Sequence, residues 1–144
     1  MKWLTTLGLC ALVGCGGMKQ KALEDAMVSI WNVGDLSVID AAYEAELAHE
    51  VKRFVTENRD LYPDLEVTVD QVIVKGPWFV SMWTVSGTHR ELDLPVQISG
   101  VSVRKREGGV FVEERMVYDQ KSVYDQLGFR VVPPAGASAF GETD

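Results

Sequence analysis

Cysteine and histidine are both scarce in this sequence of 144 residues, which has two of each. Both cysteines, Cys10 and Cys15, lie near the N-terminus, so the rest of the chain has no thiol for a disulfide or for a nucleophile. The histidines, His49 and His89, are far apart and are not part of a cluster of carboxylates in the sequence. We therefore expect no metal site.

Basic residues are also in deficit, with 14 Lys and Arg against 21 Asp and Glu and a net charge of −7. A nucleic-acid-binding surface needs clustered basic side chains, so we expect no nucleic-acid partner. Hydrophobic residues make up 47% of the chain, which is enough for one domain with its own core.

The apolar run Trp3–Val13 is too short for a stable membrane span and follows a short basic start. This pattern predicts a secretory signal peptide over residues 1–14. Leu12-Val13-Gly14-Cys15 resembles a bacterial lipobox, which implies lipidation of Cys15 with acyl chains such as palmitate. Because two or three chains hold a protein on a membrane, we expect a lipid-anchored protein of the bacterial cell envelope. The alternative is an ordinary secretory peptide with an incidental Cys15.

Helical periodicity dominates the first half of the remaining chain. After a tether predicted at residues 15–20, apolar residues of Lys21–Val33 recur on one stripe, which predicts a helix ended by the following glycine. A second helical pattern covers Leu36–Asn58, either as one helix or as two with a break near Ala48-His49. Tyr62-Pro63 ends this pattern, because the residue before proline avoids the helical conformation.

A period of two then replaces the helical pattern. In the first strand the apolar residues change face halfway, which predicts a bulge or burial on both faces. The predicted elements are strands at Glu66–Lys75, Trp78–His89, Val96–Arg106 and Val110–Asp119, a short helix at Gln120–Leu127 stopped by Gly128, and a disordered tail at 130–144. Helices followed by antiparallel strands indicate an α+β fold, in which N-terminal helices cover the concave side of a curved sheet and leave a pocket.

Several short blocks resemble a known family. They are Trp31-Asn32-Val33-Gly34-Asp35-Leu36, Tyr62-Pro63-Asp64-Leu65, Gly87-Thr88-His89-Arg90, Ser99-Gly100-Val101, and Asp119 with Gln126-Leu127-Gly128. In this order they resemble the SnoaL-like polyketide (ester) cyclase family, with a domain at residues 21–129. The resemblance implies the cone-shaped fold of nuclear transport factor two, with a hydrophobic pocket that needs no metal or cofactor.

The resemblance also implies candidate catalytic residues. Asp119 falls where the family's cyclases have an acid/base aspartate, and His49 and His89 fall near histidines of the family. Two loops that would help to close the pocket are shorter here than in the family. Arg115 replaces a common tryptophan and, on the face of Asp119, would favour an ionised carboxylate.

Each candidate also has a structural interpretation. Asp119 can cap the helix that follows it, His49 can be solvated, and His89 can hold a turn. Arg104-Lys105-Arg106 is most simply a charged strand end. The candidate ligand-binding residues, which can equally form core or a dimer interface, are Tyr43, Phe79, Trp83, Arg115 and Val117.

Two functions from different classes remain. The favoured one is a membrane-anchored module that binds a small, largely apolar molecule without turnover, because the loops are short and Arg115 is present. The alternative is a cofactor-independent acid/base enzyme, such as a cyclase, an isomerase or a hydrolase, that uses Asp119. A third interpretation is a structural subunit that forms a homodimer through the outer face of the sheet.

Overall fold

The computed structural model describes residues 16–130 and 132 and has the predicted α+β architecture. Its four strands form one antiparallel sheet in the order β1-β2-β3-β4. The elements are α1 (Gly16–Val28), the π-helical turn η1 (Ser29–Val33), α2 (Ser37–Ala42), α3 (Ala45–Leu61), β1 (Glu66–Lys75), β2 (Trp78–His89), β3 (Leu94–Glu107), β4 (Val110–Tyr118) and α4 (Gln120–Gln126).

Three predictions fall outside the described residues: the signal peptide at 1–14, the lipidation of Cys15, and nearly all of the tail at 130–144. Residues 16–20, predicted as part of a tether, instead form the start of α1, and Gln20 Nε2 donates to Val72 O of β1 at 2.9 Å. Within residues 16–130, no helix is long and apolar enough to cross a membrane.

The break in the second helical pattern lies at Tyr43-Glu44, five residues before the predicted position at Ala48-His49. Tyr43 is extended, with φ −119° and ψ 152°, and bridges to Phe111 of β4. Glu44 N donates to Phe111 O at 3.0 Å, and the Glu44 carboxylate accepts from Glu46 N and Leu47 N at the start of α3. The pairing with β4 and this N-cap together separate α2 from α3.

The bulge predicted in β1 is present. The pairing with β2 shifts between Val69 and Gln71, so one extra residue lies in β1. This residue reverses the alternation, and Val67 and Val72 are therefore both buried on the same face of the sheet.

A second bulge, in β4, was not predicted and changes which side chains face inward. Lys105 pairs with Glu113 but Arg106 pairs with Phe111, so Val112 is the extra residue. Strict alternation along β4 would place Phe111, Arg115 and Val117 on the same face. Because of the bulge, Phe111 enters the core whereas Arg115 and Val117 are exposed on the opposite face.

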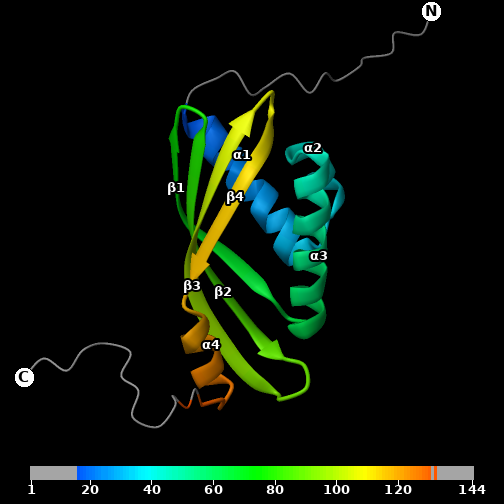
Figure 1. Cartoon of the computed structure of the whole chain (residues 1–144), viewed down its shortest axis with the longest axis vertical. Helices are drawn as coiled ribbons and strands as arrows, with labels where there is room; N and C mark the ends of the chain where they lie inside the picture. The colour runs from blue at the N-terminus through cyan, green and yellow to red at the C-terminus, as the bar shows by residue number, and fades with distance from the viewer. Residues whose placement is uncertain (1–15, 131, 133–144) are drawn as a thin grey trace, which may run out of the picture.

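All helical segments before β1 lie on one face of the sheet, as Figure 1 shows. α1 packs along β1. α3 lies farther from the sheet, and its C-terminal end is near the start of β1 and the end of β2. The core therefore lies between helices and sheet, and its buried residues include Leu23, Met27, Ile30, Ile39, Tyr43, Val55, Val67, Phe79, Trp83 and Phe111.

Candidate functional site

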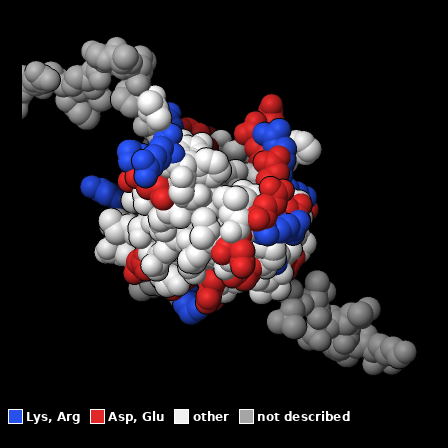
Figure 2. Space-filling model, turned by 90° about the horizontal axis from the view of Figure 1, so that it is seen from below, with Lys and Arg blue, Asp and Glu red and all other residues white. Residues whose placement is uncertain are grey.

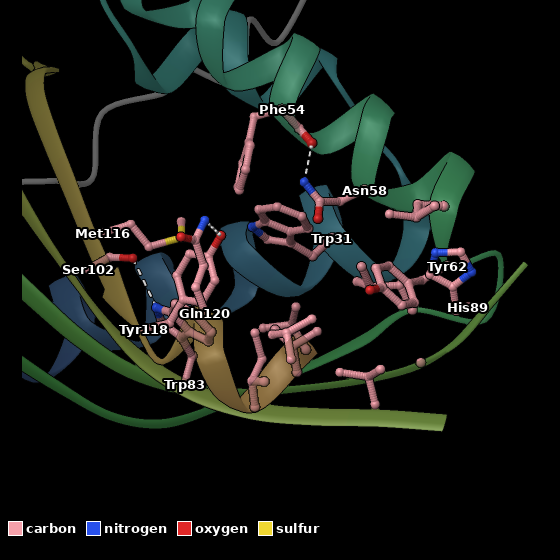
Figure 3. A pocket seen from close by; sticks show the side chains of 18 of the residues that line it. Trp31, Phe54, Asn58, Tyr62, Trp83, His89, Ser102, Met116, Tyr118 and Gln120 are labelled. Atoms are coloured by element: carbon pink, nitrogen blue, oxygen red, sulfur yellow. Dashed lines mark hydrogen bonds between the residues drawn. The ribbon is translucent and has the colours of Figure 1, made fainter. Parts of the chain in front are cut away.

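A pocket of about 330 Å³ lies between α3 and the concave face of the sheet. This volume is in the range of sites for small organic molecules. Its walls are mostly apolar and aromatic, and Figure 3 labels Trp31, Phe54 and Trp83 among the lining side chains. Other lining residues are Met27, Asn58, Leu61, Tyr62, Leu65, Val67, Val85, Gly87, His89, Val96, Ile98, Ser102, Arg104, Met116, Tyr118, Gln120, Val123, Tyr124, Leu127 and Phe129.

Part of the pocket wall lies at the lower end of the molecule in Figure 1. This part is formed by residues from the C-terminal end of α3, from β2 and from α4. Several apolar side chains at this end are exposed: Leu61, Leu92, Leu94, Tyr124 and Phe129. Figure 2 looks at this end and shows a central surface of mainly uncharged residues with acidic and basic side chains around its edge. An apolar molecule therefore meets an uncharged surface here.

Trp83 forms one wall of the pocket and lies against a glycine on the neighbouring strand. A Cβ atom on Gly100 would lie 2.3 Å from Cη2 of Trp83, so only glycine leaves room for the indole there. Trp83 Nε1 donates to Ser102 Oγ at 2.9 Å, which holds the ring in place. Gly100 and Ser102 thus keep the indole back against β3 and leave the pocket open.

The polar groups at this pocket are hydroxyls, amides, one imidazole and the guanidinium of Arg104, which is paired with Glu114. His89 Nδ1 accepts from Glu91 N and Leu92 N, each at 3.3 Å, and the ring of His89 meets Tyr62 edge-on. Burial raises the pKa of Tyr62, and Tyr118 nearby raises it further. No Asp or Glu is among the described residues that line this pocket. The walls therefore favour a neutral, largely apolar molecule.

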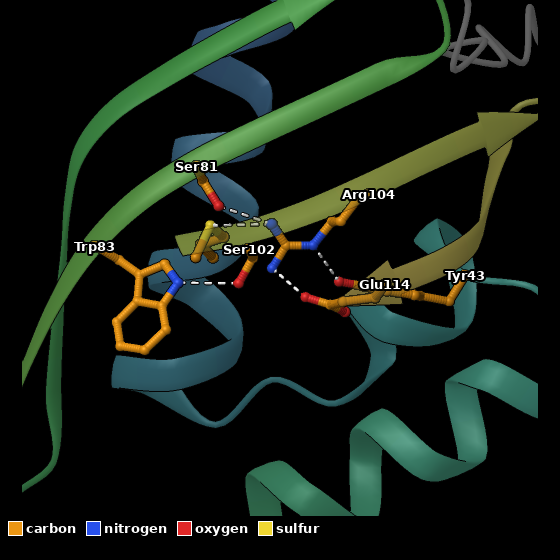
Figure 4. Close-up of polar contacts among 7 residues, drawn as sticks. Tyr43, Ser81, Trp83, Ser102, Arg104 and Glu114 are labelled. Atoms are coloured by element: carbon orange, nitrogen blue, oxygen red, sulfur yellow. Dashed lines mark hydrogen bonds and ion pairs between the residues drawn. The ribbon is translucent and has the colours of Figure 1, made fainter. Parts of the chain in front are cut away.

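The deepest polar feature is a buried arginine, Arg104, whose side chain is 2% exposed (Figure 4). Its Nη2 pairs with Glu114 Oε1 at 2.5 Å, Nε donates to Tyr43 Oη at 3.0 Å, and Nη1 donates to Ser81 Oγ at 2.8 Å. Burial raises the pKa of the Tyr43 hydroxyl, so Tyr43 stays neutral. Arg104 had been interpreted as part of a charged strand end, and the structure corrects this.

A second cavity of about 290 Å³ adjoins the first and shares the wall residues Met27, Trp31, Phe54, Arg104, Met116 and Tyr118. It lies between α3 and β4, and its other lining residues are Ile30, Tyr43, Leu47, Glu50, Val51 and Glu114. Glu50 is exposed, whereas the Glu114 side chain is only 10% exposed. The two cavities therefore differ in charge, because carboxylates line only the second one among the described residues.

The structure brings some of the predicted site residues together. Trp83 and His89 line the first pocket, and Tyr43 lines the second. Phe79 is in the core against Phe111 and lines neither cavity.

The other predicted site residues lie outside both cavities. His49 is exposed on α3, and Arg115 and Val117 are exposed on the outer face of β4. Asp119 is exposed and is the N-cap of α4, where its Oδ1 accepts from Ser122 N at 3.0 Å. The expectation that Arg115 faces the pocket is therefore wrong, because the bulge at Val112 sets the inward face of β4.

Sequence reasoning missed Arg104 and Glu114 as interior residues. A signal was available in β3, because Arg104 shares its period-two face with Val96, Ile98 and Ser102. The pairing of Arg104 with Glu114 gave no such signal, since it depends on the bulge. Within residues 16–130, no group of three or more His, Cys, Asp or Glu side chains is placed to hold a metal ion.

Comparisons with known proteins agree with this architecture. A model of the SnoaL-like polyketide cyclase family matches residues 21–129. TsrD from Streptomyces laurentii is similar with a TM-score of 0.68 at 18% identity, covering 75% of this chain and 93% of TsrD. AclR from Streptomyces galilaeus has a TM-score of 0.67 at 23% identity, covering 81% of this chain and 85% of AclR.

A protein with a ketosteroid isomerase-like fold from Catenulispora acidiphila has a TM-score of 0.65 at 12% identity, covering 76% of this chain and 95% of that protein. No curated protein matches the chain. At these identities the solved structures establish the fold, which is the predicted cone of the nuclear transport factor two type.

Proposed function

Because the chain belongs to the SnoaL-like polyketide cyclase family, we propose that it binds a small, largely apolar molecule in the pocket between α3 and the sheet. Binding without turnover is the function that the site supports best. The observation that carries it is an aromatic-walled pocket of about 330 Å³ with no carboxylate among its described lining residues.

Acid/base chemistry needs a titratable group within hydrogen-bond reach of the substrate. Asp119 does not line the pocket, and its Oδ1 already accepts from Ser122 N at the start of α4. His49 is on the exposed face of α3. The geometry therefore supports the capping interpretation of Asp119 rather than its interpretation as acid or base.

A catalytic alternative rests on His89, the one histidine that lines the pocket. Its Nδ1 accepts from two backbone N–H groups, which places the proton of the neutral ring on Nε2. Such a ring could donate a hydrogen bond from Nε2 to a bound oxygen and so stabilise charge that develops on it, and this is the single feature that favours an enzyme. His89→Gln distinguishes the two functions, because a binding module retains its ligand whereas an enzyme loses turnover.

Binding is tested by calorimetry with a neutral apolar probe such as decanol and two tryptophan variants of α3. Asn58 lines the pocket, whereas Thr56 is exposed on the same helix. We expect Asn58→Trp to fill the pocket and weaken binding by more than about tenfold, which is the loss of roughly 1.4 kcal/mol or more. Thr56→Trp should bind as the native chain does. Equal binding by both variants, or no binding by the native chain, would contradict the proposal.

We further propose that the chain is exported and held on a membrane by lipid on Cys15. The support is the sequence Leu12-Val13-Gly14-Cys15 after a short apolar run. Metabolic labelling with palmitate should mark the native chain and not Cys15→Ser. If both chains partition into detergent equally, the anchor is not at this cysteine.

A further inference from the structure

The two cavities lie next to each other along α3. The two cavities share six wall residues. One helix, α3, lines one or both of them with Leu47, Glu50, Val51, Phe54, Asn58 and Leu61. These positions recur every three or four residues, so they occupy one face of α3. From residue 47 to residue 61 this face is about 21 Å long. A molecule that fills both cavities is therefore elongated.

The ends of this site differ in charge. At the end nearer α4, the described lining residues include no Asp or Glu. At the other end, Glu50 and Glu114 line the second cavity together with Arg104. A ligand that spans the site therefore has different surroundings at its two ends.

Arg104 does not make the second cavity an anion site. Its Nε, Nη1 and Nη2 already hold Tyr43, Ser81 and Glu114, and Nη1 also points to Met27 Sδ at 3.9 Å. An anion would have to displace Glu114 from a buried ion pair, which leaves a buried carboxylate uncompensated.

The remaining charge in the second cavity is negative. The charges of Arg104 and Glu114 balance each other at 2.5 Å, and Glu50 makes no ion pair with any residue that the structure describes. Glu50 is exposed at the edge of a cavity walled by Trp31, Phe54 and Tyr43. A carboxylate beside aromatic walls suits a cation, because both attract positive charge.

We propose that the second cavity is a head-group subsite, in which Glu50 receives the cationic ammonium end of an elongated amphiphile whose apolar body occupies the first pocket. This inference rests on the proposed function and adds the ligand class: long, apolar and cationic at one end. The second cavity and the walls that it shares with the first pocket define the subsite, and Glu50 sets the charge that the subsite prefers.

The test compares three probes of one chain length by calorimetry on the full chain, below their micelle concentrations: decyltrimethylammonium, decanol and decanoate. We expect decyltrimethylammonium to bind about fivefold tighter than decanol, and decanoate to bind most weakly. Raised salt should reduce the preference for the cation, because Glu50 is exposed to solvent.

Two variants of α3 remove the same charge at different places. Glu50→Gln should bring decyltrimethylammonium and decanol within about twofold of each other. Glu57→Gln, an exposed position that lines neither cavity, should keep the native preference. Both changes are at exposed sites, so the fold is retained, and circular dichroism checks this.

Different failures have different meanings. Two outcomes would overturn the head-group subsite and leave the proposed function standing. One is tight binding of decanol with no preference for decyltrimethylammonium. The other is an equal loss of the preference for decyltrimethylammonium in Glu50→Gln and Glu57→Gln. No binding of any of the three probes would overturn both.

Discussion

Single residues decide the interior of this protein, and Arg104 is the clearest case. Its guanidinium is 2% exposed and joins residues from α1, β2, β4 and the break between α2 and α3. A buried ion pair is weak support for stability as a whole, but the loss of one partner is costly, because the other charge remains buried. Arg104 and Glu114 therefore act as a pair.

We expect Arg104→Met alone to lower the free energy of unfolding by about 3–5 kcal/mol. Arg104→Met with Glu114→Leu removes both charges and should lose less than half as much. Urea denaturation measures both. A single variant close to the native stability, or a double variant no better than the single, would contradict the pairing.

Gly100 controls the size of the pocket through Trp83. In Gly100→Ala the new Cβ would lie 2.3 Å from Trp83 Cη2, so the indole must move from its place against β3. We expect stability to fall by about 1–3 kcal/mol and the affinity for decanol to change.

The matched rescue is Gly100→Ala with Trp83→Phe, because the smaller ring leaves space for the methyl group. This double variant should recover part of the lost stability, because the new Cβ would still lie 2.8 Å from the carbonyl oxygen of Val117. If Gly100→Ala has native stability and affinity, the close packing of Trp83 on Gly100 does not limit the pocket.

At the scale of the element, α4 forms one wall of the pocket and has few attachments to the sheet. Asp119 caps its first turn, and the Gln126 side chain pairs with the backbone N–H and C=O of Gln97 in β3 at 2.9 and 3.0 Å. β4 pairs with β3 only as far as Gly100 and Tyr118, so Gln126 takes the place of a strand partner beyond that point. Val123 and Leu127 line the pocket from this helix.

Substitution of Asp119 separates its two interpretations. Asp119→Ala removes the acceptor for Ser122 N and should lower stability by about 1 kcal/mol, with little change in ligand affinity. Asp119→Asn keeps an N-cap without the negative charge, so its stability should stay close to native. Thermal unfolding and calorimetry measure both. If Asp119→Asn abolishes a measured turnover while the fold is retained, the carboxylate has a catalytic role after all.

For the whole molecule, the face of the sheet opposite the described helices carries several exposed apolar side chains. Met82 pairs with Val101, and Val101 pairs with Val117, in one row across three strands. Met82 is 42% exposed and Val117 is 70% exposed, and Ile73 and Trp78 are also exposed. Exposed apolar side chains gathered on one face of a sheet are typical of an association surface.

We expect two copies of the chain to associate through this face, as a homodimer. Met82→Glu should shift the chain toward the monomer in sedimentation velocity, because a charge enters the apolar row. Thr56→Glu, on α3, is the matched control and should sediment as the native chain does. A native chain that sediments as a monomer at high concentration would contradict the prediction.

Local patterns were sufficient for the order and type of the elements. Helical stripes, period-two runs and turns with Gly or Pro depend on neighbours in the chain, so the sheet of four strands and the helices before it followed from them. The bulge in β1 was also visible, because its apolar residues change face.

Tertiary packing decided which residues meet inside. The bulge at Val112 depends on pairing between β3 and β4, and it exchanged Arg115 and Val117 for Glu114 and Met116 on the inner face. The helix break at Tyr43 likewise depends on a contact with Phe111, far along the chain. A shift of one residue in a strand reverses every side chain beyond it, and the local periodicity of β4, unlike that of β1, carried no sign of its shift.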